Sequence, residues 1–345
     1  MGEKKNVLLV GGGGVGAIGA LNLEAGGLAA VTAVLRSNYQ VVKDDGFEIH
    51  SCDHGVLKGW RPTQVVSKVP NVKEENLPAF DYIVCATKNI PDVPPTVVDI
   101  ISPAVTPSHT VIVLIQNGLN IEKPIFAAFP QNIVLSGVSM IGSNETKLGF
   151  IQHDEVDEII ISAFENPNLE TAVQVAAAED FVRAYSAAGK CKCSHDANVG
   201  FVRWRKLVYN ACINPVSAIT DLDSGRLQIA DGAADTLLRP AMEEIRAAAK
   251  VFGHDLPAEV IQKTITVDPV DMYLPPSMLG DVRKGNFIEF ENLLGEPLRD
   301  GTAKGVPMPT LTVLYNLCKA IQWRNKQLKG LIEIPPKKDY TTSPH

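Results

Sequence analysis

The spacing of hydrophobic residues divides the chain into two parts. Up to about residue 190, short apolar runs alternate with stretches of helical period. The runs at 7–10, 31–35, 81–86, 110–115, 133–140 and 158–164 read as strands, with 47–49 and 64–66 as two further possible strands. Helices are expected at 17–25, 97–101 and 169–188, the last ended by Gly189. Strand–helix alternation of this kind predicts an α/β fold with a doubly wound parallel sheet.

Beyond residue 196 the pattern is helical throughout. The expected helices are 197–219, 232–252, 256–266, 278–284, 287–304 and 308–328, and 190–195 is expected to be the linker. We therefore predict a nucleotide-binding domain over 1–193 and an all-helical domain over 194–334. The polar, proline-containing segment 335–345 is expected to be a disordered tail.

A glycine cluster follows the first strand and opens the first helix. Gly11, Gly13 and Gly16 fit the pattern G-x-G-x-x-G in the context that gives it meaning, between a strand and a helix. The first glycine permits a tight turn, the second lets a pyrophosphate approach the backbone, and the third lets helix and strand pack closely. With Gly14 and Val15, these residues predict a dinucleotide site in a Rossmann-type domain.

The ends of three predicted strands carry further candidates for cofactor binding. Arg36 lies twenty residues past Gly16, where an NAD-binding fold normally has a carboxylate. An arginine there suits a 2′-phosphate and predicts NADP(H); a solvated surface arginine is the alternative. Lys88 and Asn117 follow two other strands, and each could also be a plain polar residue at a strand end.

The helical half has a narrow polar stripe. Lys206, Asn210 and Asn214 fall at i, i+4 and i+8 among apolar neighbours, which is typical of a cleft wall, although a partly exposed helix edge would give the same period. Pro215 should kink this helix. Further along, Ser277 stands at an expected helix N-cap and Glu289 in an otherwise apolar helix start.

Composition narrows the class of protein. The chain has 345 residues, is 45% hydrophobic and 21% charged, and carries a net charge of −7. The acidity argues against a nucleic-acid partner, and no apolar run is long enough to span a membrane. Six scattered cysteines indicate a reducing compartment, and we expect a cytoplasmic protein. Cys191, Cys193 and His195 lack a second ligand pair with zinc-site spacing, so no metal is expected.

Taken together, these residues resemble the ketopantoate reductase (2-dehydropantoate 2-reductase) family over most of the chain. The resemblance is carried by the glycine turn, Arg36, Lys88, 116–118, 206–215, 277–283 and Glu289. The sequence departs from the family pattern at Asn292, where an aromatic residue is usual, and at Leu294, where the family often has asparagine.

The resemblance implies NADPH-dependent reduction of a 2-keto acid, with ketopantoate as the first candidate, and a possible homodimer. Lys206 would protonate or polarise the developing alkoxide, and Glu289 would hydrogen-bond the substrate hydroxyl and orient Lys206. Asn117, Asn210, Asn214 and Ser277 would hold the substrate, with Asn117 also near the nicotinamide, while Arg36 and Lys88 would take the nucleotide end. Two alternatives remain open: a relative that reduces another keto acid, and a non-catalytic NADP(H)-sensing module.

Overall fold

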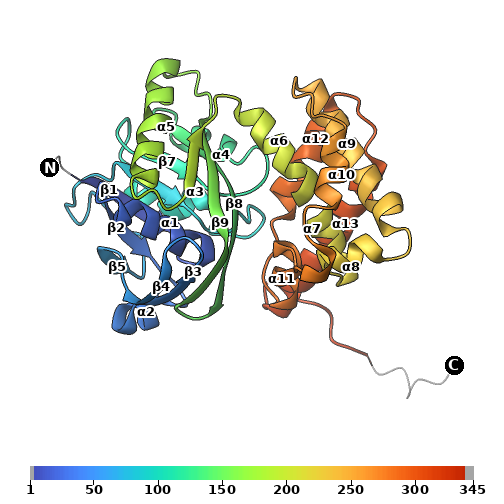
Figure 1. Ribbon diagram of the computed structural model, residues 1–345, viewed down its shortest axis with the longest axis horizontal. Coiled ribbons are helices and arrows are strands. Elements are labelled where there is room, and N and C mark those ends of the chain that lie inside the picture. Colours follow the sequence, from blue (N-terminus) through green and yellow to red (C-terminus); the bar gives the residue numbers. More distant parts are fainter. Residues whose placement is uncertain (1–3, 339–345) are drawn as a thin grey trace.

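A computed structural model describes residues 4–338, in which an α/β domain is followed by a helical domain (Figure 1). This confirms the predicted fold class. The predicted domain boundary falls inside β10 (Lys192–His195), the last strand of the sheet, and α6 begins at Val199. Of the predicted disordered tail, 335–338 have no regular secondary structure and 339–345 lie outside the described residues.

One sheet of ten strands organises the first domain, in the order β4-β3-β9-β8-β7-β6-β1-β2-β5 with β10 beside β9. The strands not yet named are β1 (Lys5–Val10), β2 (Ala29–Val34), β3 (Phe47–Ser51), β4 (Gly55–Trp60), β5 (Gln64–Val66), β6 (Tyr82–Cys85), β7 (Val111–Leu114), β8 (Val134–Lys147) and β9 (Phe150–Ala163). β1 runs parallel to β2 and β6, so the carboxyl ends of these strands meet at one edge.

Helices cover both faces of the sheet. Val7 and Leu9 of β1 pack in one core with α1 (Gly14–Ala25) and α5 (Thr171–Ser186). Leu8 and Val10, which point the other way, pack in a second core with α3 (Val97–Ile101) and α4 (Lys123–Ala128). A strand that is buried on both faces has to be apolar throughout, so β1 could be predicted from its hydrophobic run.

The sheet differs from the predicted parallel sheet, because it is mixed. β8 and β9 form a long antiparallel hairpin, and β4 pairs antiparallel with β3. The sequence predicted only 133–140 and 158–164 of the hairpin, missed β4, and assigned β10 to a linker. The outer parts of β8 and β9 are largely exposed or half-buried, so they carry no continuous apolar run. Cross-strand pairing holds them in place.

The second domain is all-helical (Figure 1). Its helices are α6 (Val199–Asn210), α7 (Ile213–Thr220), α8 (Ser224–Ile229), α9 (Arg239–Val251), α10 (Glu259–Ile265), α11 (Ser277–Arg283), α12 (Glu296–Ala303) and α13 (Pro309–Leu328), with a short π-helical turn, η4 (Glu291–Gly295), before α12. A single core joins α6, α7, α9 and α13 through side chains such as Leu207, Met242 and Leu311.

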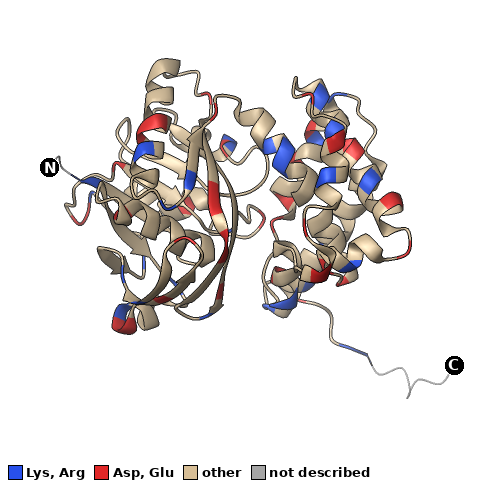
Figure 2. Ribbon diagram, in the orientation of Figure 1, with Lys and Arg blue, Asp and Glu red and all other residues tan. Residues whose placement is uncertain are grey.

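Acidic and basic residues are interspersed over both domains (Figure 2). Among the described residues, no helix is both long and apolar enough to cross a lipid bilayer.

Candidate active site

The glycine cluster forms a tight turn between β1 and α1. Gly11 has φ +105°, and a Cβ there would lie 2.8 Å from the backbone nitrogen of Thr87. A Cβ on Gly16 would collide with the carbonyl of Gly11, so the helix packs directly on the turn. Gly13, the N-cap of α1, has no atom within 4 Å of its Cβ position. The helix N-terminus is therefore open on this side, as phosphate binding there requires.

Arg36 lies just beyond β2, whose last residue pairs with that of β1. Its side chain is exposed, and it makes no hydrogen bond or ion pair with another residue in the described part of the chain. Nearby, Asn38 donates from Nδ2 to the carbonyl oxygen of Gly12 at 2.9 Å and to Oε1 of Glu145 at 2.7 Å. A free guanidinium thus stands beside a glycine turn that is held in place.

The predicted polar stripe is assembled from two helices. The expected helix 197–219 is broken at 211–212, and Pro215 is the third residue of α7, in a first turn where its missing N–H costs nothing. Asn214 is 1% exposed, and its Nδ2 lies 3.4 Å from both Oδ1 of Asn210 and Oγ of Ser277. Asn210, Asn214 and Ser277 are therefore brought together, as predicted.

Ser277 is not the N-cap that the sequence predicted. Pro276 occupies the cap position, Ser277 is the first residue of α11, and its hydroxyl faces Asn214 instead of the helix end. Oδ1 of Asn214 is buried and has no hydrogen-bond partner within residues 4–338. This leaves hydrogen-bonding capacity unused in the cleft.

Lys206 lies one turn before Asn210 and is only partly exposed. Its ammonium donates to the carbonyl oxygen of Ser139 on β8. Burial is the main cause that lowers the pKa of Lys206 to about 8. The cations of Arg203 and Lys88 also lower this pKa, and the carboxylate of Glu289 acts to raise it. A narrow pocket is lined by Asn117, Lys206 and Asn210, among others. Asn117, which the resemblance places near the nicotinamide, therefore lies next to the polar stripe.

Glu289 and Lys88 form an ion pair across the two domains. Oε2 of Glu289 lies 3.4 Å from Nζ of Lys88, and its Oε1 accepts the N–H of Asn89 at 2.8 Å. Nζ of Lys88 also lies 2.8 Å from Asp281. Burial acts to lower the pKa of Lys88, but the two carboxylates raise it overall. The sequence placed Lys88 at the nucleotide end and Glu289 beside Lys206; in the structure these two side chains hold each other.

Two residues outside the predicted set hold the loop after β7 at the site. Asn292 donates from Nδ2 to the carbonyl of Leu119 at 2.8 Å and accepts the N–H of Leu119 at 3.0 Å, so it holds the loop after β7. Arg203 is 5% exposed and contacts the same loop from α6. Asn292 stood out in the sequence only as a departure from the family pattern. Arg203 was not predictable, because helical period alone does not separate it from its exposed neighbour Arg205.

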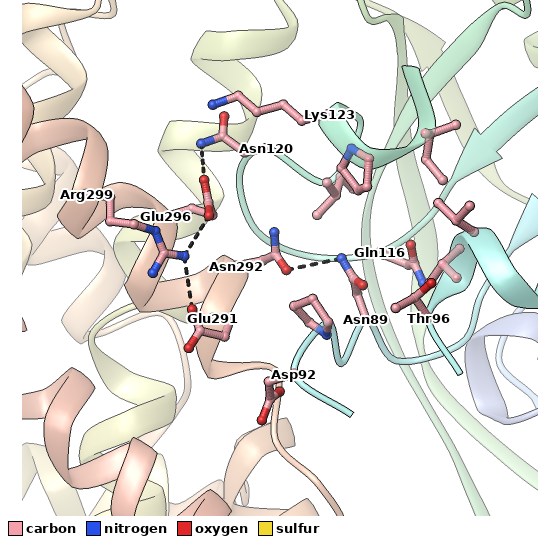
Figure 3. Close-up of a pocket in the computed structure, with 16 residues that line it drawn as sticks. Asn89, Asp92, Thr96, Gln116, Asn120, Lys123, Glu291, Asn292, Glu296 and Arg299 are labelled. Atoms are coloured by element: carbon pink, nitrogen blue, oxygen red, sulfur yellow. Dashed lines mark hydrogen bonds and ion pairs between the residues drawn. The ribbon is translucent and has the colours of Figure 1, made fainter. Parts of the chain in front are cut away.

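The domain interface also contains a half-open cavity of about 390 Å³ next to the site (Figure 3). Residues of α3 and α4 form its apolar wall, and residues of η4 and α12 form its polar wall. Asn89 donates from Nδ2 to Oδ1 of Asn292 at 3.2 Å on one side, and Arg299 holds Glu291 and Glu296 on the other. Asn120 also donates to Glu296, whereas Lys123 and Asp92 have no bond to another residue drawn there (Figure 3).

A possible cation site outside the cleft comes from the β3–β4 turn and β9. Ligand atoms of Cys52, Asp53 and His153 lie within 4.8 Å of one another. Oγ of Ser51 accepts the N–H groups of Asp53 and His54 at 3.1 and 3.0 Å, so its own proton goes to Nδ1 of His153 at 2.8 Å. The ring proton then lies on Nε2, the nitrogen that faces Cys52 and Asp53. This tautomer does not ligate a cation, and we assign no metal there.

Comparison with known proteins identifies the family of both domains. Residues 7–166 match the family Ketopantoate reductase PanE/ApbA, and residues 198–322 match Ketopantoate reductase PanE/ApbA C terminal. An uncharacterized protein of Saccharomyces cerevisiae is 38% identical, covering 96% of this chain and 97% of its own. The 2-dehydropantoate 2-reductase of Nostoc sp. is 26% identical, covering 94% and 98%.

A solved structure gives the same result for the fold. The crystal structure of 2-dehydropantoate 2-reductase from Methylococcus capsulatus has a TM-score of 0.74 and 30% sequence identity, covering 93% of this chain and 97% of that chain. The match spans both domains. The chain therefore belongs to the ketopantoate reductase family.

Proposed function

We propose that this protein is an oxidoreductase that reduces a 2-keto acid to the 2-hydroxy acid with NADPH, and that 2-dehydropantoate is its substrate. The observation that carries the proposal is Lys206, an ammonium with a pKa of about 8 beside the amide side chains of Asn210 and Asn117. Placing an ammonium where burial disfavours its charge costs free energy. A perturbed lysine in a cleft, next to hydrogen-bonding groups, is the arrangement expected of a proton donor.

Bound NADPH would supply the hydride to the keto carbon. Lys206 gives its proton to the carbonyl oxygen as negative charge develops there, because an ammonium with a pKa near 8 is charged at neutral pH and a stronger acid than an ordinary lysine. Asn210, Asn214 and Ser277 bind the carboxylate and the hydroxyl of the substrate. The unpartnered Oδ1 of Asn214 would accept a hydrogen bond from a hydroxyl group.

The residues at the glycine turn fit NADPH. Gly13 leaves the N-terminus of α1 open for a pyrophosphate, with Gly11, Gly14, Val15 and Gly16 completing the turn. Arg36, exposed at the neighbouring strand end, would bind the 2′-phosphate. Lys88 is held by Glu289 and Asp281, and we propose that the pair of Lys88 and Glu289 orients the substrate hydroxyl or the ribose.

The test is NADPH oxidation by the purified protein with a panel of 2-keto acids. Wild type is compared with Lys206→Ala, and Lys319→Ala, which removes an exposed lysine on α13, serves as the control. We expect turnover with 2-dehydropantoate that falls at least about a hundredfold in Lys206→Ala and is unchanged in the control.

Other results would change the proposal in distinct ways. Turnover with a different keto acid would keep the reaction and replace the substrate. Binding of NADPH without turnover of any keto acid would indicate the sensing module. An enzyme that prefers NADH would contradict the role of Arg36.

We further propose a cytoplasmic enzyme of pantothenate biosynthesis. The six cysteines are all free, which suits a reducing compartment. We also predict a homodimer, which sedimentation of the purified protein would test.

A further inference from the structure

Arg203 is a buried cation on the first helix of the helical domain, yet its contacts lie in the nucleotide-binding domain. Its Nε donates to Oγ of Ser136 on β8 at 2.8 Å. One terminal nitrogen donates to the carbonyl oxygens of Gln116 at 3.1 Å and Gly118 at 2.8 Å, and the other lies 3.5 Å from that of Leu114. The fork of the guanidinium thus binds the end of β7 and the loop that follows it.

The charge of Arg203 is compensated by dipoles. No ion pair joins it to a carboxylate within residues 4–338, and carbonyl oxygens and the ring of Phe164, 4.9 Å from Cζ, surround the guanidinium. Burial lowers the pKa of Arg203 to about 10, with Glu122 opposing the effect. At neutral pH the side chain is therefore a fixed positive charge with little water around it.

The loop that Arg203 binds carries Asn117. Its glycine, Gly118, has φ +95°, and a Cβ there would lie 2.6 Å from the carbonyl oxygen of Asn292. Arg203 holds this loop from α6, and Asn292 holds it from η4. The loop is therefore fixed between two elements of the helical domain.

Arg203 also lies three residues before Lys206, on the same side of α6. The charged groups that act on Lys206 are Arg203 on its own helix, Lys88 after β6 and Glu289 before η4, while β8 contributes the uncharged carbonyl of Ser139. A neighbouring cation with little solvent between disfavours a second positive charge.

We propose that Arg203 is a positioning residue of the reductase: it holds the Asn117 loop against α6, and its buried charge makes Lys206 a better proton donor. This inference rests on the proposed role of Lys206. The two effects are separable, because a lysine at position 203 keeps the charge but cannot bind four acceptors. A glutamine keeps some hydrogen bonding but has no charge.

The experiment measures the pH dependence of kcat/KM for keto-acid reduction and, independently of turnover, the pKa of Lys206. The pKa of Lys206 is measured by NMR on protein whose lysine ε-carbons are isotopically labelled. The signal of Lys206 is assigned as the one that is missing from Lys206→Met. The variants are Arg203→Gln, Arg203→Met as a second neutral side chain, and Arg203→Lys. Arg205→Gln is the matched control, since it removes the same charge from an exposed position on the same helix.

We expect both neutral variants to raise the pKa of Lys206 and the basic limb of the profile by about one unit or more. Arg203→Lys should leave both in place and lower kcat/KM about tenfold or more, because the Asn117 loop is no longer held. Arg205→Gln should change neither. An unchanged pKa of Lys206 in the folded neutral variants would overturn the inference. If the NMR shift appears but wild type reduces no keto acid, the proposed function fails while the action of Arg203 on Lys206 stands.

Discussion

Replacing Gly118 with alanine tests whether the Asn117 loop is fixed by its contact with the helical domain. Two costs are expected. At φ +95° an alanine is strained by about 1–2 kcal/mol. Its Cβ would also lie 2.6 Å from the carbonyl oxygen of Asn292, so the loop or η4 has to move. That movement disturbs two hydrogen bonds between Leu119 and Asn292, each worth about 1 kcal/mol. We expect a loss of about 3 kcal/mol in the free energy of unfolding.

Gly189→Ala is the matched control for this prediction. Gly189 also has positive φ, +65°, but no atom lies within 4 Å of its Cβ position. The control therefore suffers backbone strain alone, partly offset by the lower entropy of the unfolded chain, and should lose about 1 kcal/mol or less. Denaturant unfolding of both variants gives the difference, and kcat/KM should fall at least about tenfold in Gly118→Ala only. Equal losses of stability, or full activity in Gly118→Ala, would show that the Asn292 contact does not fix the loop.

Three further predictions concern the chemistry of the site. Arg36→Gln should raise KM for NADPH by about tenfold or more and leave KM for NADH nearly unchanged, as measured by cofactor oxidation, since only NADPH has the 2′-phosphate; equal effects on the two cofactors would contradict this. Reduction needs the protonated form of Lys206, so the rate of keto-acid reduction should fall as the pH rises through about 8. Oxidation of the hydroxy acid needs the neutral amine, so the rate of that reaction should rise over the same pH range. Parallel pH profiles for the two directions would exclude Lys206 as the proton donor. Asn214→Ala should raise KM for the keto acid by about tenfold with little change in KM for NADPH, and a larger effect on the cofactor would place Asn214 elsewhere.

Much of the fold and part of the candidate site could be predicted from the sequence, because burial and helix period leave a local pattern of residues. A strand covered on both faces has to be apolar, so β1, β6 and β7 appear as continuous runs. Parallel strands bring their carboxyl ends to one edge, so the glycine turn and Arg36 could be placed together. Lys206 and Asn210 share a helix face by the period of the helix itself.

Other parts depend on contacts between segments far apart in the chain. The hairpin of β8 and β9 is half-exposed and held by pairing, so no hydrophobic run marks its outer half. Glu289 accepts a hydrogen bond from Asn89, two hundred residues earlier, and the same approach brings Lys88 to Glu289. Local residue patterns contain no information on contacts between segments so far apart in the sequence.

The sequence by itself determined a Rossmann-type domain with a glycine turn, an arginine suited to NADP(H), and a helix with one lysine and two amides. Only the tertiary structure decided how these parts act on one another. Docking of the helical domain removes water from Lys206, brings Lys88 of the first domain near it, and fixes the Asn117 loop between α6 and Asn292. The acidity of a side chain depends on the charges and solvent around it in space. Helix period supplies the neighbouring charge of Arg203, but burial and the charges from distant segments come only with domain packing.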